Sequence, residues 1–230
     1  MRYFTPGHEM NLCGHATIAG VKALFEKENK KIKTVETLSG IIDVNMEVQN
    51  TGKTFISMKQ LPAQFEEFKG DKAKLAEAIG ITEKDIDDDL PIMYGSTGIW
   101  TLLIPIKKLD IFSKMKPENK RFPEVLTQKP RASVHPFCLE TYDENADMHG
   151  RHFSSPFSGT VEDPVTGTAS GVMGAYYISF IKSLDEKNIA VEQGQEIGKS
   201  GMIYVKVKKE YGNLNVEIKG EAVYAGEIFL

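Results

Sequence analysis

The sequence contains few of the residues from which disulfide scaffolds and metal centres are built. Only two cysteines occur among its 230 residues, and Cys13 and Cys138 lie 125 positions apart (138 − 13). Two distant cysteines favour free thiols over a disulfide framework, as is usual in the cytoplasm. The chain also lacks a Cys-x-x-Cys pair and any His/Cys cluster at metal-ligand spacing. We therefore expect no metal site.

The chain also lacks an excess of positive charge and a long apolar run. Its formal net charge is −4 and its pI is about 5.8, which disfavours a nucleic-acid partner. No apolar segment approaches the roughly 18 residues that a membrane helix needs, and the first residues lack the basic and apolar regions of a signal peptide. With 41% hydrophobic and 26% charged residues, the composition predicts a cytoplasmic globular protein without membrane or nucleic-acid partners.

Two distant segments of the sequence are similar to each other. The first reads RYFTP at 2–6 and EMNLCGHAT at 9–17, and the second reads RHFSSP at 151–156 and EDPVTGTAS at 162–170. Glu9 and Glu162, like Gly14 and Gly167, are separated by 153 positions (167 − 14). Each copy predicts a strand, a loop rich in Pro and Gly, and a helix. Two copies predict two similar lobes with a site between them; the alternative is one lobe with a chance repeat.

The apolar periodicity predicts the remaining elements and an α+β fold. Helices are expected at 16–29, 71–79 and 168–181, and strands at 30–49, 54–59, 91–94, 99–106, 132–141, 189–191, 202–208, 214–218 and 223–230. We predict a first lobe over 1–90 and a second over 91–230, with the last strand returning to the first lobe. The strand pair around Gly95 lies 72 residues before Gly167 (167 − 95). Its counterpart would precede residue 1, so the first lobe is expected to be incomplete.

The chemistry is expected where the two helices of the repeat begin. A helix N-terminus offers free backbone N–H groups and a partial positive charge, and it therefore attracts carboxylates. At Gly14 and Gly167 no side chain keeps a ligand away from the backbone, and Thr17 and Ser170 could satisfy N-terminal donors. Two opposed helix starts would hold a small carboxylate between the lobes.

Three side chains near these helix starts are suited to acid–base chemistry. His15 can accept or donate a proton near neutral pH, although it could also only hydrogen-bond the loop backbone. Asp163, which Pro164 restricts to extended backbone, can orient His15 across the cleft or cap its own loop. Thr168 offers a hydroxyl at the position that mirrors His15, or caps its helix. The remaining histidines are expected to be structural or on the surface: His8, His135, His149 and His152.

Cys13 raises the alternative of a racemase in which two thiols exchange protons across a cleft. Such a reaction requires a cysteine at the start of both helices. Thr166 occupies the position that mirrors Cys13, and Cys138 lies outside the repeat. The two-thiol interpretation is therefore weak, and we expect Cys13 to be a small buried residue.

These motifs resemble the PhzF family, the phenazine-biosynthesis-like isomerases of the diaminopimelate-epimerase fold. The resemblance rests on RYFTP at 2–6, Glu9, CGHAT at 13–17 and EDPVTGTA at 162–169, with support from QGQEIG at 193–198 and GEAVYAG at 220–226. It extends over essentially the whole chain. It implies two pseudo-symmetric lobes, each a curved, mostly antiparallel sheet around a central helix, and often a homodimer.

The resemblance also implies a reaction. Family members isomerise small carboxylates in the cleft by acid–base proton transfer without a cofactor, and in the best-known member the substrate is a dihydro-hydroxyanthranilate. There a Glu moves a proton between carbons, supported by a His, an Asp and a Ser. His15 and Asp163 match the His and the Asp, and Thr168 stands in place of the Ser. The residues expected to bind the substrate are Gly14, Ala16, Gly167 and Ala169.

The sequence departs from the family pattern in one respect. The resemblance places the catalytic Glu upstream of the RYFTP strand, in a segment that this chain lacks, and neither Glu9 nor Glu36 takes its position. Three explanations compete: a mis-assigned start, an interrupted gene, or a partner chain that supplies the segment. We expect this chain by itself to be a poor isomerase, and the alternative function is a non-catalytic small-molecule-binding or assembly protein.

Overall fold

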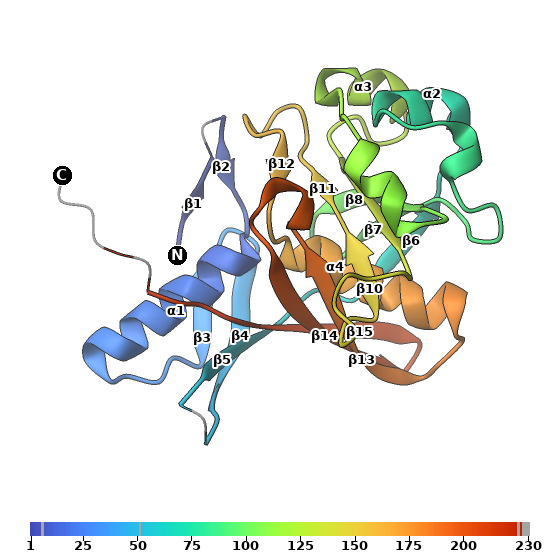
Figure 1. Ribbon diagram of the computed structural model, residues 1–230. Helices are drawn as coiled ribbons and strands as arrows, with labels where there is room; N and C mark the ends of the chain where they lie inside the picture. Colours follow the sequence, from blue (N-terminus) through green and yellow to red (C-terminus); the bar gives the residue numbers. More distant parts are fainter. Residues whose placement is uncertain (6, 51, 225, 227–230) are drawn as a thin grey trace.

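The computed structural model describes residues 1–5, 7–50, 52–224 and 226 (Figure 1). Its helices are α1 (Gly14–Glu28), α2 (Lys72–Ala78), α3 (Phe122–Val125) and α4 (Gly167–Tyr176), which a π-helical turn continues over Tyr177–Ile181. The strands are β1 (Tyr3–Phe4), β2 (Glu9–Met10), β3 (Thr34–Thr37), β4 (Gly40–Val48), β5 (Thr54–Lys59), β6 (Gln64–Glu67), β7 (Met93–Ser96), β8 (Trp100–Pro105), β9 (Ser133–Cys138), β10 (Met148–Gly150), β11 (His152–Phe153), β12 (Glu162–Asp163), β13 (Glu186–Gln193), β14 (Gly201–Glu210) and β15 (Asn213–Glu221).

Most of the strands form one large mixed sheet. Its order is β3-β4-β5-β15-β14-β13-β10-β9-β8-β7-β6, with β11 paired to β9 and β12 paired to β11. Within the described residues, the pairs β8–β9 and β10–β13 are parallel and the others are antiparallel. Strands β1 and β2 form a separate hairpin. The predicted α+β class is confirmed.

Strand β15 joins the early strands of the chain to the late ones. It pairs with β14 on one side and with β5 on the other, so that Ile218 lies between Val205 and Met58. All three side chains are buried because apolar residues alternate along these strands and face the helices. We expected a strand at 223–230 to make this connection, and that expectation is wrong for Val223, Tyr224 and Gly226, which lie outside any strand. Residues 225 and 227–230 lie outside the described residues.

Strand β6 and helix α2 lie beside elements from later in the chain. Strand β6 pairs with β7 at the end of the sheet, and Leu75 of α2 belongs to the same apolar cluster as Phe122 of α3 and Ile104 of β8. The strand predicted at the start of the second repeat is β11. The short strands β6, β10 and β12 were not predicted from the sequence, because two to four residues carry too little periodicity. We keep the division into two lobes, 1–90 and 91–230, as a proposal.

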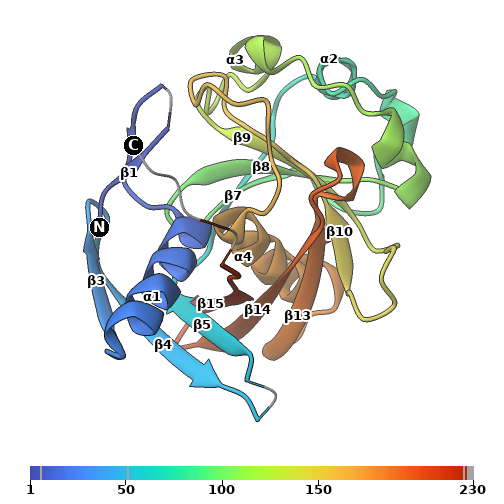
Figure 2. The same cartoon turned by 60° about the vertical axis from the view of Figure 1, so that its left-hand side comes forward.

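The two longer helices lie against the middle of the sheet (Figure 2). Helix α1 contacts β5 and β15, and α4 contacts β7, β14 and β15. Every residue of α4 is buried except Thr168, whereas α1 buries only the stripe that contains Thr17, Ile18 and Val21 beyond its first residue. Helix α4 has small and apolar residues on all sides, and such a helix is suited to an enclosed position. The predicted helices at 16–29 and 168–181 are confirmed, and each begins one or two residues earlier than expected.

Candidate active site

The two similar sequence segments have the same local structure. In the first, β1 and β2 form a hairpin in which Phe4 is opposite Glu9, and in the second, β11 and β12 form one in which Phe153 is opposite Glu162. In each hairpin an arginine holds the glutamate with two hydrogen bonds: Arg2 to Glu9 at 2.8 and 2.9 Å, and Arg151 to Glu162 at 2.9 and 2.6 Å. Each hairpin leads directly into a helix, α1 or α4.

The first turns of α1 and α4 lie against each other. The residues before them, Cys13 and Thr166, have extended backbone, and neither side chain caps its helix within the described residues. A Cβ atom placed on Gly167 would lie 2.5 Å from Ile218 Cδ1 and 4.0 Å from Gly14 Cα. Glycine at both positions therefore allows the two helix starts to meet above Ile218. Their free N–H groups and positive dipole ends favour an anion there.

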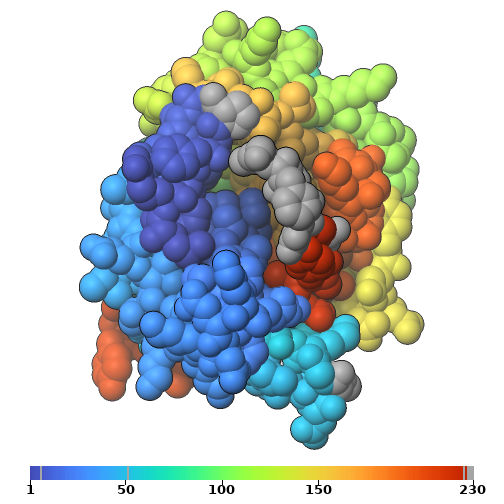
Figure 3. Space-filling model, turned by 90° about the vertical axis from the view of Figure 1, so that its left-hand side faces the viewer, coloured from blue at the N-terminus to red at the C-terminus, as the bar shows by residue number. Residues whose placement is uncertain are grey.

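A cleft of about 850 Å³ opens at these helix starts. Both hairpins contribute to its lining, and the β1–β2 hairpin projects above α1 on the face of the molecule shown in Figure 3. The residues predicted for the site all line this cleft: His15, Asp163, Thr168, Gly14, Ala16, Gly167 and Ala169. Segments 153 positions apart in the sequence therefore converge on one space.

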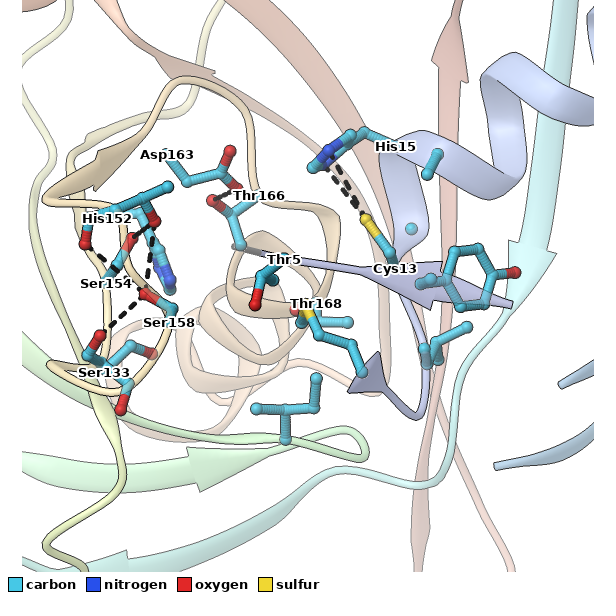
Figure 4. A pocket seen from close by; sticks show the side chains of 18 of the residues that line it. Thr5, Cys13, His15, Ser133, His152, Ser154, Ser158, Asp163, Thr166 and Thr168 are labelled. Carbon is cyan, nitrogen blue, oxygen red and sulfur yellow. Dashed lines mark hydrogen bonds between the residues drawn. The ribbon is translucent and has the colours of Figure 1, made fainter. Parts of the chain in front are cut away.

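His15 lies on the first turn of α1 and is exposed to the cleft. Its Nε2 and Nδ1 lie 3.5 and 3.8 Å from Cys13 Sγ (Figure 4). This hydrogen bond is the largest of several effects that raise the pKa of His15 to about 9. Electrostatic interactions with Cys13 and Asp163 and a hydrogen bond to the backbone of Val165 add to it, and burial opposes it. His15 is therefore mainly an imidazolium at pH 7. Asp163 and Val165, which belong to the second copy of the repeat, contribute to its raised pKa.

Asp163 is held in place by its own loop. Its Oδ2 accepts a hydrogen bond of 2.5 Å from Thr166 Oγ1, and its backbone carbonyl accepts one of 2.6 Å from Gln193 Nε2. Gln193 Oε1 in turn accepts from the Thr166 backbone N–H at 3.3 Å. These bonds support the interpretation that Asp163 caps its own loop. The charge of Asp163 also raises the pKa of His15, which supports the interpretation that Asp163 orients His15 across the cleft. Figure 4 shows Asp163 and His15 on facing sides of the pocket.

Three expectations about neighbouring residues need correction. Thr17 does not satisfy an N-terminal donor: its hydroxyl donates to the Cys13 carbonyl and accepts from Tyr3, both at 2.7 Å. Ser170 does not either, because its hydroxyl is buried and unpaired among the described residues. Cys13 is half-buried and lines the cleft, so it is not the enclosed residue that we expected. In both helices the side chain four residues after the N-cap is fully buried.

The cleft has a polar wall that sequence reasoning missed. We assigned His152 a structural or surface role, but it lines the cleft with Thr101, Ser133 and Ser154. His152 Nδ1 lies 3.2 Å from His135 Nδ1. Burial lowers the pKa of His152 to about 4 and that of His135 well below its ordinary value, so both rings are neutral at pH 7. The sequence repeat could have drawn attention to His152. In the second copy His152 follows Arg151, just as Tyr3 follows Arg2 in the first.

His149 has the structural role that we expected. It is fully buried, with Nδ1 2.9 Å from Glu192 Oε1 and Nε2 3.1 Å from Glu196 Oε1. Glu192 also accepts hydrogen bonds from the backbone N–H groups of Tyr142 and Asp143, at 2.7 and 2.9 Å. The cluster ties β10 and β13 to the loop that precedes them. Among the described residues, no group of three or more His, Cys, Asp and Glu side chains could hold a metal ion. In the same part of the chain, every helix is too short or too polar to cross a membrane.

The sequence matches a known family along almost its whole length. Residues 1–227 match the family described as "Phenazine biosynthesis-like protein". The chain belongs to this family. A crystal structure of the Bacillus anthracis phenazine biosynthesis protein, PhzF family, superposes with a TM-score of 0.93 at 52% sequence identity, covering 98% of this chain and 78% of that one. The resemblance inferred from the motifs is thus confirmed.

Relatives in this family include isomerases. The uncharacterized isomerase YfhB of Bacillus subtilis is 52% identical over 228 residues, which are 98% of this chain and 77% of the relative. The trans-2,3-dihydro-3-hydroxyanthranilate isomerase of Pseudomonas fluorescens is 25% identical over 227 residues, 98% of this chain and 77% of that enzyme. These relatives are similar to almost the whole of this chain, and the matches span about three quarters of each relative.

Proposed function

We propose that this protein is a cofactor-independent isomerase or epimerase of a small carboxylate, acting by acid–base proton transfer in the cleft. The proposal rests on one observation: His15 and Asp163, from two similar segments, line the same cleft, and the charge of Asp163 raises the pKa of His15. The proposal includes two pseudo-symmetric lobes with α1 and α4 at their centres. The matched hairpins, ion pairs and helix starts support this arrangement.

The substrate carboxylate binds at the meeting point of the two helix starts. Backbone N–H groups at Gly14, Ala16, Gly167 and Ala169 surround this point, and helix N-termini favour anions. The Thr168 hydroxyl, which mirrors His15, donates to the oxygen that gains negative charge as the carbon-bound proton leaves. The site thus binds the ground-state carboxylate and the enolate-like intermediate with the same helix ends.

The resemblance assigns the proton transfer to a Glu, whose position neither Glu9 nor Glu36 takes, and we propose that His15 moves the proton here. Its neutral form takes a proton from carbon, the resulting imidazolium is stabilised by Asp163 and Cys13, and the same proton returns to a different carbon or to the other face. The other carboxylates of the cleft are less suited to this role, because Glu9 and Glu162 are both held in two-point arginine pairs. Because the base is neutral His15, whose pKa is about 9, the rate should rise with pH and level off above that value.

The test is hydrogen–deuterium exchange at carbon. Purified protein is incubated in D₂O with chelator and a panel of small carboxylates that carry an acidic C–H bond, and exchange is followed by proton NMR. We expect His15→Asn to slow exchange by roughly 10²–10⁴-fold, the usual contribution of a general acid or base, and Thr168→Val by about 10-fold. His8→Asn is the matched control, since His8 also lines the cleft. Exchange that is equal in wild type and His15→Asn would contradict the mechanism.

Binding without exchange would favour the alternative function. If a carboxylate binds the wild type, and no member of the panel exchanges at any pH between 6 and 10, the protein is a binding protein on this scaffold. Self-association as a homodimer and a cytoplasmic location remain proposals that rest on the family resemblance and on the composition. Sedimentation velocity of the purified chain tests the first of these, and a monomer at all concentrations would contradict it.

A further inference from the structure

The first turns of α1 and α4 are held by hydroxyl groups from different places. In α1, the Thr17 hydroxyl donates to the Cys13 carbonyl one turn earlier, at 2.7 Å. The equivalent residue of α4 is Ser170, whose hydroxyl is buried and has no hydrogen-bond partner in the described part of the chain. In α4 the bond comes from outside the helix, because the Thr97 hydroxyl donates to the Thr168 carbonyl at 3.2 Å.

Thr97 belongs to a part of the sheet that can hold this turn in place. It lies between β7 and β8, which pair with each other, and its side chain is fully buried. A bond from this position fixes the Thr168 backbone relative to the sheet. The Thr168 side chain, in contrast, lines the cleft (Figure 4). Thr97 can therefore act on the site without touching a ligand there.

The Gln60 side chain lies between Thr97, α4 and β15. Gln60 directly follows β5, and its backbone N–H donates to the Val216 carbonyl of β15 at 2.9 Å. Its Oε1 lies 2.6 Å from Thr97 Oγ1. Gly171 of α4 leaves room for this amide, because a Cβ atom there would overlap Gln60 Oε1 and lie 3.2 Å from Val216 Cγ1. The amide is thus enclosed three residues after Thr168 along the helix.

The hydrogen bonds around Thr97 favour one orientation of the Gln60 amide. The Thr97 hydroxyl has a single proton, yet it has two acceptors, Gln60 Oε1 and the Thr168 carbonyl. Gln60 Nε2 is buried and unpaired among the described residues. Exchanging the two ends of the amide resolves both conflicts, because Nε2 then donates to Thr97 Oγ1 and Thr97 donates to Thr168. The unpaired atom is then an oxygen, which costs less than an unpaired N–H.

We propose that Thr97 and Gln60 are positioning residues, which hold the first turn of α4 and thereby keep the Thr168 hydroxyl in place in the cleft. We call the two bonds, from Gln60 Nε2 to Thr97 and from Thr97 to the Thr168 carbonyl, the relay. In the relay Gln60 is a donor to Thr97, so the Thr97 proton is left for the carbonyl. The inference rests on the proposed function for the role of Thr168, and it adds two residues that do not contact the substrate.

The first test observes the relay itself and needs no substrate. The backbone carbonyl ¹³C shift of Thr168 responds to a hydrogen bond at its oxygen. The shift should change in Thr97→Val and stay close to the wild-type value in Thr97→Ser, which keeps the hydroxyl. Gln60→Glu tests the orientation of the amide. At pH 9 an ionised carboxylate can only accept, so it should take the Thr97 proton and change the Thr168 shift as Thr97→Val does.

The second test is the rate of carbon–deuterium exchange with a carboxylate of the panel. Thr97→Val should lower kcat by ~3–10-fold, up to the loss expected for removal of the Thr168 hydroxyl. KM should stay within ~2-fold of the wild-type value, because the position of this hydroxyl matters most for charge that develops during the reaction. In a Thr168→Val background, Thr97→Val should have no further effect. Thr97→Ser should restore the wild-type rate.

A matched control removes a similar bond from the same helical segment. Ser179 donates to the Ala175 carbonyl at 2.8 Å, near the opposite end of α4. Ser179→Ala should therefore change neither the Thr168 carbonyl shift nor the exchange rate. A response to Ser179→Ala as large as that to Thr97→Val would assign both effects to general loosening of the helix and overturn the proposal.

The remaining outcomes separate the relay from the reaction. An unchanged Thr168 shift in Thr97→Val or in Gln60→Glu overturns the relay. So does a Thr97→Val loss of exchange that is equally large with and without the Thr168 hydroxyl, because a positioning residue acts only through its target. If no carboxylate exchanges in the wild type, the isomerase is refuted, and the carbonyl shift alone then decides whether Gln60 and Thr97 hold the first turn of α4.

Discussion

The two hairpins of the cleft have the same geometry in very different surroundings. In each, an arginine makes a two-point pair with a glutamate and stacks on a phenylalanine of the hairpin: Arg2 lies 5.0 Å from the Phe4 ring, and Arg151 lies 4.9 Å from that of Phe153. The side chains of Arg2 and Glu9 are 69% and 26% exposed, whereas those of Arg151 and Glu162 are 7% and 8% exposed. The repeated sequence therefore has repeated geometry, but the two ion pairs differ in burial.

The difference in burial follows from what each hairpin contacts. Strand β11 is paired to β9 in the main sheet, and Arg151 Nη1 also donates to the carbonyls of Phe112 and Met115, at 2.7 and 3.3 Å. Strands β1 and β2 pair only with each other among the described strands. The first hairpin is thus a peripheral part of the cleft, and the second is part of the core. Each of the following predictions compares the two copies at equivalent positions.

The largest difference is expected when the arginines are removed. Arg151→Met leaves Glu162 buried without its partner, which costs about 3–5 kcal/mol for an enclosed pair. Arg2→Met removes an exposed pair, for which the expected loss is about 0–1 kcal/mol. The measurement is the free energy of unfolding in urea for both variants and the wild type. Equal losses in the two variants would show that burial does not distinguish the copies.

A smaller difference is expected at the glycines where the helices meet. A Cβ atom on Gly167 would lie 2.5 Å from Ile218 Cδ1, and one on Gly14 would lie 3.2 Å from the same atom. Because Ile218 is fully buried, overpacking by Gly167→Ala should cost about 1–3 kcal/mol, and Gly14→Ala should cost less. The free energy of unfolding measures both.

A smaller residue at position 218 tests whether crowding against Ile218 causes this loss of stability. Ile218→Val removes the crowded methyl group, so the double variant Gly167→Ala/Ile218→Val should be more stable than the sum of the single changes predicts. Additive losses would mean that Gly167 is required for another reason.

Much of the site could be predicted from the sequence, because the repeat indicates where the candidate residues lie in the fold as well as which residues they are. Aligning Gly14 with Gly167 placed His15, Asp163 and Thr168 at helix starts, and the structure brings all three to one cleft. The strand 54–59 was predicted to the residue.

The polar wall and the sheet order could not be predicted in the same way. Thr101, Ser133 and His152 have no local pattern in common; pairing between distant strands brings them together, and such pairing leaves little trace in a single sequence. The burial of Arg151 could not be predicted either, since Arg2 lies in a similar sequence, RYF at 2–4 against RHF at 151–153. Local motifs therefore predicted the helix starts of the cleft, where we propose the catalytic residues, whereas the polar wall depends on pairing between distant strands.

The smallest expected effect concerns the two N-caps, Cys13 and Thr166. His15 has a folded-state pKa of about 9 against an ordinary value of 6.5, so protonated His15 stabilises the folded state; this contribution is complete below about pH 6.5 and is lost as the pH rises through 9. Because the hydrogen bond to Cys13 is the largest cause, Cys13→Ala should move the pKa of His15 toward 6.5 and flatten the loss of stability between these values. Thr166→Val, at the mirrored position, acts on His15 only through Asp163 and should shift the pKa less. Imidazole NMR titration measures the pKa in both variants, and an equal shift would mean that the charge of Asp163, not the thiol beside the ring, sets the protonation of His15.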